Sequence, residues 1–388
     1  MRNSMRSTGS FTPVKNNAVA VASGGDRYLI AAAALLVALG LVLVYSSSAV
    51  YADHLHHNAE YFLWRQLAFC AAGIVAAVAL ANISSSFWRQ RASWLVLGAL
   101  LTCLLVLVPA IGHQAGGQRR WLNLGFFSLQ PSELAKIAVV VAVSALLAKR
   151  EERDTDRRPS LLGPILLAQV FVGLILVESD LGTGLVIELM LAGMLFAAGL
   201  RPGALLIAGL AALPVFYHLV VGTPFRLQRL LGYIDPWAYR SSIGYQVTEA
   251  LISIGSGGIA GVGLGEGKHK LFFLPEAHTD FIFAILGEEL GYLGVLLVLV
   301  LFGLLVWRAM LAAVRAQDTF DSYLAVGLGL LIGVPAAFNM CVATGLLPTK
   351  GLPLPFLSYG GSDLVVNLAA VGILWRIGCG ERRARSAS

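Results

Sequence analysis

The run YLIAAAALLVALGLVLVYSSS (28–48) contains no charged side chain. A helix that spans a bilayer takes about 20 predominantly apolar residues, so this run predicts one transmembrane helix. Comparable runs follow along the whole chain and predict ten spans, at about 28–48, 62–82, 92–110, 131–148, 160–178, 181–200, 204–222, 279–307, 320–343 and 362–377. The pattern therefore predicts an all-α polytopic membrane protein.

The composition supports this class. The chain has 388 residues, of which 57% are hydrophobic and 13% are charged, whereas about 25% charged residues are usual in a soluble domain. A soluble enzyme, a disordered chain, a coiled coil and a disulfide scaffold are excluded on this basis. The four cysteines lie far apart and show no metal-binding spacing, so we expect isolated buried thiols.

The distribution of basic residues predicts the orientation. An even number of spans puts both termini on one side, and a cytoplasmic N-terminus places most of the 28 Lys and Arg residues on the inner side, as the positive-inside rule requires. The topology is therefore N-in and C-in. The predicted organisation is a polar cytoplasmic tail (1–27), a single transmembrane domain (28–377) and a basic cytoplasmic tail (378–388), with no nucleic acid as a partner.

Several basic residues break this bias because they fall in predicted outer loops. They are Arg119, Arg120, Arg226, Arg229, Arg240, Lys268, Lys270 and Lys350. Short translocated loops are normally poor in such residues, so the exceptions indicate an anionic ligand on the outer face; solvated loop charge is the alternative. The largest outer loop, about 223–278 between spans 7 and 8, contains YQVTEALISIGSGG (245–258), which predicts a re-entrant or interfacial helix.

Charged residues at the edges of spans need partners or a polar cavity. Glu133 and Lys136 are spaced i, i+3, so they can pair on one helix face; they either neutralise each other or line a cavity and orient other groups. Asp180 precedes span 6 and either caps that helix or, with Glu178 so close, lies beside a cation.

Asp280 is a candidate general base at the start of span 8, with His278 beside it. The helix dipole would lower its pKa, burial would oppose that effect, and a purely structural N-cap role is the alternative. One helix face would carry both Asp280 and Glu288, which places Glu288 below Asp280 in one cavity, whereas Glu289 points elsewhere and pairs there. The segment GEGKHK (265–270) lacks the residues of a phosphate loop, so neither a nucleotide nor a haem is expected.

The chain resembles the SEDS family (shape, elongation, division and sporulation) of bacterial membrane glycosyltransferases. The matching stretches occur in family order: GGQRRWLNLGFFSLQPSELAK (116–136), ESDLGTG (178–184), PFRLQRLLGYIDPW (224–237), GYQVTEALISIGSGGIAGVGLGEGKHKLFFLPEAHTDFIFAILGEELG (244–291) and GLLPTKGLPLPFLSYGGSDL (345–364). They are more similar to the cell-division branch than to the elongation branch. One departure is Glu178-Ser179, where the family usually has Gln-Pro.

The resemblance implies ten transmembrane helices with a large outer loop between helices 7 and 8. It implies a peptidoglycan glycosyltransferase that polymerises lipid II, the undecaprenyl-pyrophosphate-linked disaccharide-pentapeptide, into β-1,4 glycan strands with inversion, for septal wall synthesis. The family's essential aspartate falls on Asp280, and its helix-4 pair falls on Glu133 and Lys136.

The implied chemistry gives the outer cations a role, because the leaving group is an anionic pyrophosphate. The candidates for binding it are Arg119, Arg120, Arg226, Arg229, Lys268, Lys270 and Lys350. A divalent cation, Mg²⁺ or Mn²⁺, is expected to share this role, with Asp280 and Asp180 as candidate ligands. The expected partners are membrane lipid, a class B penicillin-binding protein (a transpeptidase) and other divisome proteins, at the septum of the bacterial cytoplasmic membrane.

Three alternatives stay open: a lipid II flippase, a non-catalytic divisome scaffold and the elongation polymerase. A flippase needs polar groups through the full depth of the membrane. Here the polar motifs gather toward the outer face, in 112–133, 178–183, 223–280 and 345–363, which favours chemistry at that surface.

Overall fold

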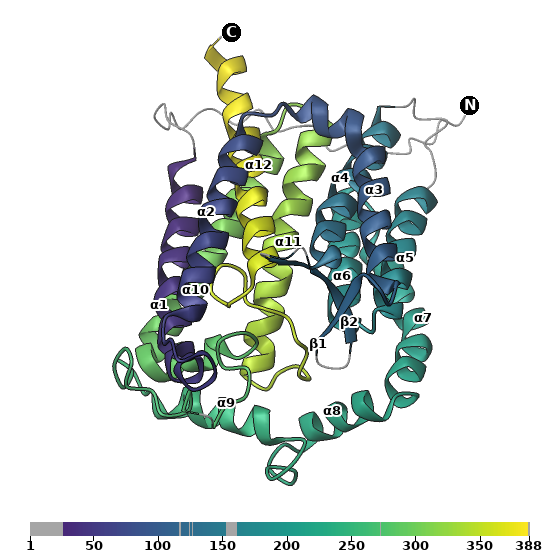
Figure 1. The fold of residues 1–388 in the computed structure, drawn as a ribbon. Helices are drawn as coiled ribbons and strands as arrows, with labels where there is room; N and C mark the ends of the chain where they lie inside the picture. Colours follow the sequence, from purple (N-terminus) through teal and green to yellow (C-terminus); the bar gives the residue numbers. More distant parts are fainter. Residues whose placement is uncertain are drawn as a thin grey trace, which may run out of the picture.

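The computed structural model describes residues 26–386 apart from 116–117, 124, 126, 153–160 and 272. Among these residues, ten apolar helices lie alongside one another in a bundle (Figure 1). They are α1 (Arg27–His56), α2 (Tyr61–Ala81), α3 (Ser85–Leu107), α4 (Pro131–Glu151), α5 (Leu162–Val177), α6 (Leu181–Ala197), α7 (Pro202–Val221), α10 (Ile282–Arg315), α11 (Thr319–Ala343) and α12 (Gly361–Ser386). Each predicted span corresponds to one of these helices, so the all-α membrane class is confirmed.

Eight of the described helices are long and apolar enough to cross a membrane. The other two, α5 and α6, have 16 and 17 residues, or roughly 25 Å at 1.5 Å per residue. The helices differ in burial: α4 lies at the centre with 78% of its most apolar window buried, whereas only 6% of that window is buried in α7. The side chains of Leu206, Ile207 and Tyr217 on α7 are exposed, as lipid-facing side chains would be.

The first and last helices place both ends of the bundle's chain on one side. The start of α1 and the end of α12 lie at the same end (Figure 1), and an ion pair of 2.7 Å between Asp26 and Arg308 ties α1 to the distal part of α10 there. Both termini of the bundle therefore share one side, as an even number of spans requires. The assignment of that side to the cytoplasm stays a prediction from charge.

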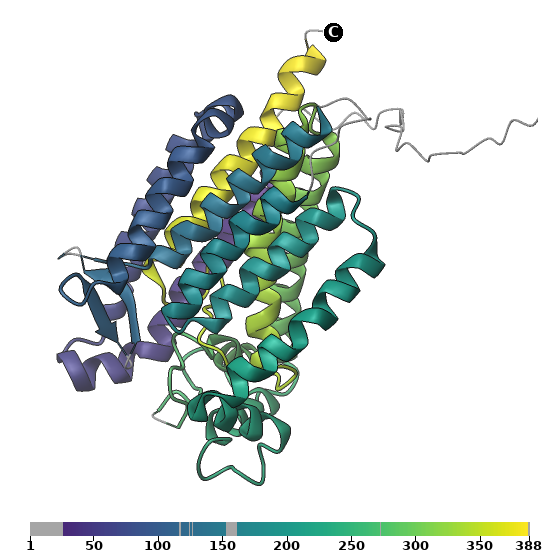
Figure 2. The same cartoon turned by 90° about the vertical axis from the view of Figure 1, so that its right-hand side faces the viewer.

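A small antiparallel sheet lies between α3 and α4 and was not predicted. It contains β1 (Gly112–Ala115), β2 (Gln118–Asn123) and β3 (Ser128–Leu129), in the order β1-β2-β3. Figure 2 shows it at the outer end of the bundle, beside α3. The strands are short and polar and show no clear apolar alternation, which is the signal that predicts a strand.

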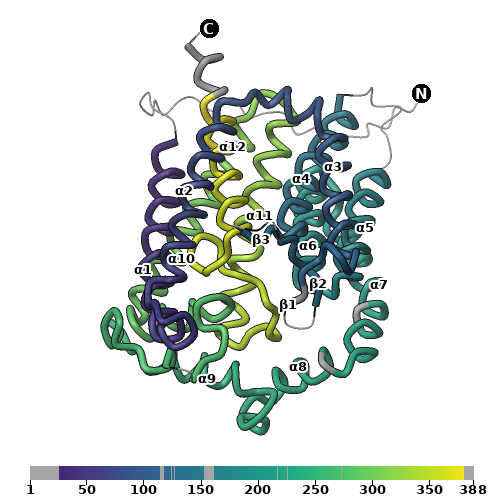
Figure 3. The backbone as a smooth tube through the Cα atoms, in the orientation of Figure 1, coloured from purple at the N-terminus to yellow at the C-terminus, as the bar shows by residue number. Residues whose placement is uncertain are grey.

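The large outer loop forms two further helices, α8 (Pro224–Ile234) and α9 (Tyr245–Ser256), which run across the outer end of the bundle (Figure 3). The predicted helix at 245–258 is thus confirmed. The chain after α9 pairs with a break in α10, where Gly291 has φ 63° and ψ −161°. A backbone in that region is essentially restricted to glycine. This docking fixes the outer loop against the bundle.

Candidate active site

Asp280 lies in the turn that precedes α10. Its backbone N–H donates to the Glu276 carbonyl at 3.1 Å, and the buried side chains of Phe281 and Ile282 anchor the turn. Because α10 begins at Ile282 with Phe281 at the N-cap, Asp280 does not cap the helix. The alternative of a capping role is therefore wrong.

The Asp280 carboxylate accepts no hydrogen bond from any residue in the described part of the chain. The residue is half-buried, and a Cβ added to Gly351 would lie 3.3 Å from its Oδ2 atom. Burial, reinforced by the nearby Glu276, raises the pKa of Asp280 to about 7, while Arg229 and Arg120 oppose the rise. A carboxylate with free oxygens and a pKa near neutrality is suited to general base catalysis.

Four cations lie in this region, and we call them the basic cluster: Arg120 on β2, Arg226 and Arg229 on α8, and Lys350 in the loop after α11. The charges of Arg229 and Arg120 act on Asp280, and all three arginines act on Lys350. On α8 the two arginines are spaced i, i+3 and so share a face. The Arg229 Nη1 atom donates to the Thr349 carbonyl at 3.4 Å, which joins α8 to the Lys350 loop. Burial, with the charges of Arg229 and Arg226, lowers the pKa of Lys350 to about 8.

Arg120 connects the sheet to the turn between α5 and α6. Its Nη2 atom donates to the Ser179 carbonyl at 2.5 Å, and its Nε atom donates to the Glu178 carbonyl at 3.3 Å. Arg119 differs, since it is exposed while Arg120 is half-buried, as expected for neighbours that point to opposite faces of a strand. Of this predicted pair, only Arg120 contributes to the basic cluster.

Asp180 caps α6. Its Oδ1 atom accepts from the Thr183 N–H at 3.1 Å and its Oδ2 atom accepts from the Thr183 hydroxyl at 2.9 Å. The capping interpretation is confirmed, and both oxygens are engaged. No group of three His, Cys, Asp or Glu side chains suitable for a metal occurs among the described residues. Asp280 is therefore the better candidate ligand, because its oxygens remain free.

Glu178 lies two residues before this cap, and its carboxyl group has an unusual environment. Its side chain is buried, and within the described part of the chain neither carboxylate oxygen has a hydrogen-bond partner. Burial, with the charge of Asp180, raises the pKa of Glu178 to about 8, and Arg120 opposes the rise. Glu178 therefore lies in the fold as a neutral carboxyl group at neutral pH.

Glu133 and Lys136 pair as predicted, with 2.8 Å between Lys136 Nζ and Glu133 Oε2. Asp363 on α12 lies 3.9 Å from the same ammonium, and its Oδ1 atom accepts from Asn367 at 2.9 Å. All three charged side chains are buried. The pair is thus part of a buried triad that joins α4 to α12 and neutralises its charges within the bundle, and its orienting role stays a prediction.

His278 belongs to an aromatic cluster. Its ring centroid lies 4.9 Å from that of Phe62 and 5.6 Å from that of Tyr51. Burial lowers the pKa of His278, against the opposing charge of Glu276. The lowered pKa favours the neutral ring, which packs against Phe62 and Tyr51. His278 is close to Asp280 in sequence, but no contact between their side chains is found among the described residues.

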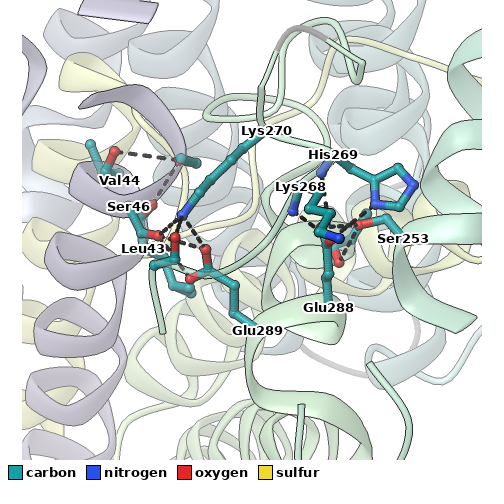
Figure 4. A network of polar contacts seen from close by, with 12 residues as sticks. Leu43, Val44, Ser46, Ser253, Lys268, His269, Lys270, Glu288 and Glu289 are labelled. Atoms are coloured by element: carbon teal, nitrogen blue, oxygen red, sulfur yellow. Dashed lines mark hydrogen bonds and ion pairs between the residues drawn. The ribbon is translucent and has the colours of Figure 1, made fainter. Parts of the chain in front are cut away.

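Three predicted site residues, Lys268, Lys270 and Glu288, lie in two neighbouring groups of polar contacts that we together call the closed network (Figure 4). One group joins Lys270 to Glu289 and Ser46, and the other joins Glu288 to Ser253, Lys268 and His269. Lys270 Nζ lies 2.6 Å from Glu289 Oε1 and 2.9 Å from the Ser46 hydroxyl. The predicted pyrophosphate role of Lys270 is wrong, because its ammonium is already paired and buried. The separate pairing of Glu289 is confirmed.

Glu288 completes the closed network, so its predicted place below Asp280 is wrong. Its Oε1 atom accepts from the Lys268 N–H at 2.8 Å and lies 3.0 Å from His269 Nδ1, and its Oε2 atom accepts from the Ser253 hydroxyl at 3.1 Å. The prediction assumed that Asp280 was already helical, whereas α10 begins two residues later. The exposed Lys268 side chain lines an outer pocket of about 820 Å³ with Trp237.

Sequence reasoning missed Asn339 and Ser358, which contact the Asp280 turn. A signal existed for Asn339, since it is a lone amide in the apolar span 320–343, and such a group needs partners. Ser358 had no comparable signal, because a serine in a loop is ordinary.

Comparison with known proteins agrees with the geometry. The family model described as a cell cycle protein, covering FtsW, RodA and SpoVE, matches residues 26–383. The probable peptidoglycan glycosyltransferase FtsW of Trichlorobacter lovleyi is 43% identical over 92% of this chain and 94% of its own length. The stage V sporulation protein E of Bacillus subtilis is 38% identical over 91% and 96%.

Two solved structures share the fold. A chain from work on structural coordination of polymerization and crosslinking by a peptidoglycan synthase complex has a TM-score of 0.77 and 31% identity, covering 92% of this chain and 98% of its own. The rod shape determining protein RodA of Thermus thermophilus has a TM-score of 0.67 and 29% identity, covering 92% and 97%. The chain belongs to the FtsW/RodA/SpoVE family of cell cycle proteins.

Proposed function

We propose that this protein is a peptidoglycan glycosyltransferase that polymerises lipid II into glycan strands at the outer face of the cytoplasmic membrane, for septal wall synthesis. The observation that carries the proposal is the free carboxylate of Asp280 within the basic cluster at the outer end of the bundle. This combination supplies a base for the acceptor and cations for an anionic leaving group. The FtsW-type relatives support the division role over elongation.

The Asp280 carboxylate takes the proton of the acceptor, the 4-hydroxyl of a terminal GlcNAc. That oxygen attacks the anomeric carbon of the donor, and the bond from that carbon to the pyrophosphate oxygen breaks, with the electron pair leaving on the undecaprenyl pyrophosphate. A single displacement on an α-linked donor inverts the centre and gives a β-1,4 link. A pKa of about 7 leaves enough carboxylate at neutral pH and still makes it a useful base.

The basic cluster binds the donor pyrophosphate and stabilises the charge that develops on it. Two faces of the site contribute, with Arg120 coming from the sheet and Arg229 from α8. Donors that are already fixed by other bonds stabilise a developing anion without reorganisation, and Arg120 is fixed by its bonds to the 178–179 carbonyls.

A divalent cation, Mg²⁺ or Mn²⁺, is part of the proposal. Mg²⁺ is commonly held by one or two carboxylates together with substrate phosphates, and Asp280 offers free oxygens for this. Such an ion offsets pyrophosphate charge when bound. Asp180 contributes through its fixed negative charge near Arg120.

A class B penicillin-binding protein is the proposed partner, together with other divisome proteins. Support comes from the structural relative that belongs to a peptidoglycan synthase complex. A transpeptidase beside this site would crosslink strands as they form, and the proposed place of the pair is the division septum.

The test is polymerisation of lipid II by the purified full-length protein in liposomes, with its class B partner and with Mg²⁺, Mn²⁺ or a chelator. Wild type is expected to make glycan strands that a gel resolves, and Asp280→Ala is expected to make none while staying folded. A folded, partnered wild type that makes no strands would contradict the proposal. Transfer of lipid II between leaflets in the same vesicles would then favour a flippase.

A further inference from the structure

The turn that carries Asp280 is held from outside its own segment. Three successive main-chain carbonyls each accept one hydrogen bond from α11 or from the loop 344–360: His278 from the Tyr359 N–H at 2.9 Å, Thr279 from the Ser358 hydroxyl at 2.5 Å and Asp280 from Asn339 Nδ2 at 2.8 Å. Three consecutive bonds leave the turn little freedom to shift or rotate. The donors lie about 60 to 80 residues away in the chain, so this is tertiary fixation.

Both hydrogens of the Asn339 side-chain amide are donated to main-chain carbonyls. Its side chain is 2% exposed, and Nδ2 donates to the Asp280 carbonyl and to the Leu352 carbonyl, the latter at 2.7 Å. Two carbonyls face one amide nitrogen, so both of its hydrogens are required. A carboxylate or a flipped amide would place oxygen against two oxygens. The bonds therefore join the Asp280 turn and the loop 344–360 through one side chain.

Ser358 performs a similar function one residue earlier in the turn. Its side chain is buried, and its hydroxyl donates to the Thr279 carbonyl while accepting from the Leu354 N–H at 2.8 Å. The hydroxyl thus links the turn to the interior of the loop 344–360. Loss of it leaves a buried carbonyl and a buried N–H unsatisfied.

The same loop also forms the wall beside the carboxylate. A Cβ added to Gly351 would lie 3.3 Å from Asp280 Oδ2, and the next residue back, Lys350, belongs to the basic cluster. The loop therefore both holds the backbone of Asp280 and lines its carboxylate. Within the described part of the chain, no residue donates a hydrogen bond to the side chain of Asp280.

We propose that Asn339 and Ser358 are positioning residues that fix the Asp280 carboxylate at its working distance from the acceptor and the basic cluster. The proposal rests on the proposed function, because it assigns a role to the backbone around the proposed base. A displacement of about 1 Å in a reacting group can cost about 10²-fold in rate. Lipid II binding depends on the basic cluster, which these two residues do not contact.

The experiment measures kcat and KM of polymerisation for Ser358→Ala and Ser358→Thr in the full-length, partnered protein. We expect Ser358→Ala to lower kcat by about tenfold to a hundredfold with KM changed less than threefold. Ser358→Thr retains the hydroxyl and is expected to recover most of the rate.

The matched control is Ser144→Ala on α4. Ser144 is buried, and its hydroxyl also donates to a main-chain carbonyl, that of Val140 at 2.7 Å, but it has no bond to the Asp280 turn. We expect unchanged kcat and KM for this variant. Equal losses of kcat in both alanine variants, with no recovery in Ser358→Thr, would mean a general packing effect and would overturn the proposal.

Asn339→Ser gives the same comparison if Ser358→Ala does not fold, because a shorter hydroxyl cannot bond to both carbonyls. It is expected to lower kcat with KM changed less than threefold. Wild-type kcat in this variant, or in a folded Ser358→Ala, would overturn the positioning role alone. A folded wild type without polymerase activity would instead overturn the proposed function.

Discussion

The Asp280 site with its basic cluster and the closed network both combine carboxylates with basic side chains, but they differ in how these charges are satisfied. In the closed network, the Lys270 ammonium has Glu289, Ser46 and the Gly265 carbonyl within 2.9 Å, and its side chain is 6% exposed. Beside the basic cluster, the carboxylate of Asp280 accepts no hydrogen bond from the described residues. Charges satisfied within the fold stabilise it, whereas charges left for a ligand can perform chemistry.

Sequence position alone does not separate the two regions. Lys270 and Asp280 lie ten residues apart in one loop, and Glu288 follows eight residues later. The separation arises because the chain after α9 docks at the break in α10, where the Val262 N–H donates to the Glu288 carbonyl at 3.0 Å. The docked segment brings the Lys270 ammonium to the Glu289 carboxylate. Asp280 instead stays in the turn that precedes α10.

The largest expected difference is between two isosteric amide substitutions. Asp280→Asn removes the proposed base and is expected to lower kcat by about 10²- to 10⁴-fold, with the melting temperature almost unchanged. Glu288→Gln weakens a structural acceptor and is expected to lower the melting temperature while each folded molecule keeps near wild-type kcat. Polymerisation rates and thermal unfolding in detergent measure both. Equal rate losses would remove the distinction between the regions.

The next effect concerns stability. Lys270→Met leaves the Glu289 carboxylate buried without its counter-charge, and breaking a buried pair in this way costs about 3–5 kcal/mol. Denaturant unfolding of the purified protein measures the loss. The double variant Lys270→Met with Glu289→Gln removes both charges and is expected to recover much of it. A fully stable Lys270→Met would show that the pair is not what holds the outer loop.

A smaller effect is expected when one cation of the basic cluster is removed. Arg229→Ala is expected to raise KM for lipid II by about tenfold, because a hydrogen bond to a charged group contributes about 1.5–3 kcal/mol. Arg119→Ala is the matched control, since this arginine is exposed on β2 and lies apart from the cluster. Kinetics at varied lipid II concentration measure both. Equal increases in KM would indicate a general effect of outer positive charge.

The smallest effect is a pH-dependent change in stability at Glu178. Its folded pKa of about 8 exceeds its ordinary value of 4.5, so the folded state keeps a proton that the unfolded state releases between these values. Stability therefore falls as pH rises through this window and levels off above pH 8. Glu178→Gln lacks this loss, and its melting temperature should exceed that of wild type by a few degrees at pH 8.5 and by almost nothing at pH 4.5. A difference independent of pH would contradict the buried neutral carboxyl.

Sequence patterns predicted the helices and part of the site for clear physical reasons. Apolar runs of bilayer length predict spans, and i, i+3 spacing predicts the Glu133–Lys136 pair. Basic residues in predicted outer loops break the positive-inside bias, and this exception singled out Arg120 and Arg229 as site residues. Helix ends were less accurate, because α10 begins at Ile282 and not at 279, and that error misplaced Glu288.

What sequence patterns could not predict depends on tertiary contacts. The three short strands pair across turns and have little periodicity of their own. Lys270 looked like a ligand-binding cation because its partner, Ser46, lies on the first helix. The Asn339 contact with the Asp280 turn joins residues far apart in the chain. In each case the structure depends on contacts with another segment of the chain, which the local sequence does not specify.

The central claim is that an unpaired, partly desolvated Asp280 is the base of the reaction. The most direct measurement is the pH dependence of kcat/KM for lipid II polymerisation by the partnered wild-type protein, because it reports the pKa of the essential base in the free enzyme. The account predicts that the rate rises with a midpoint near pH 7, following the pKa of Asp280. A rate that is constant from pH 5 to pH 9 would contradict it.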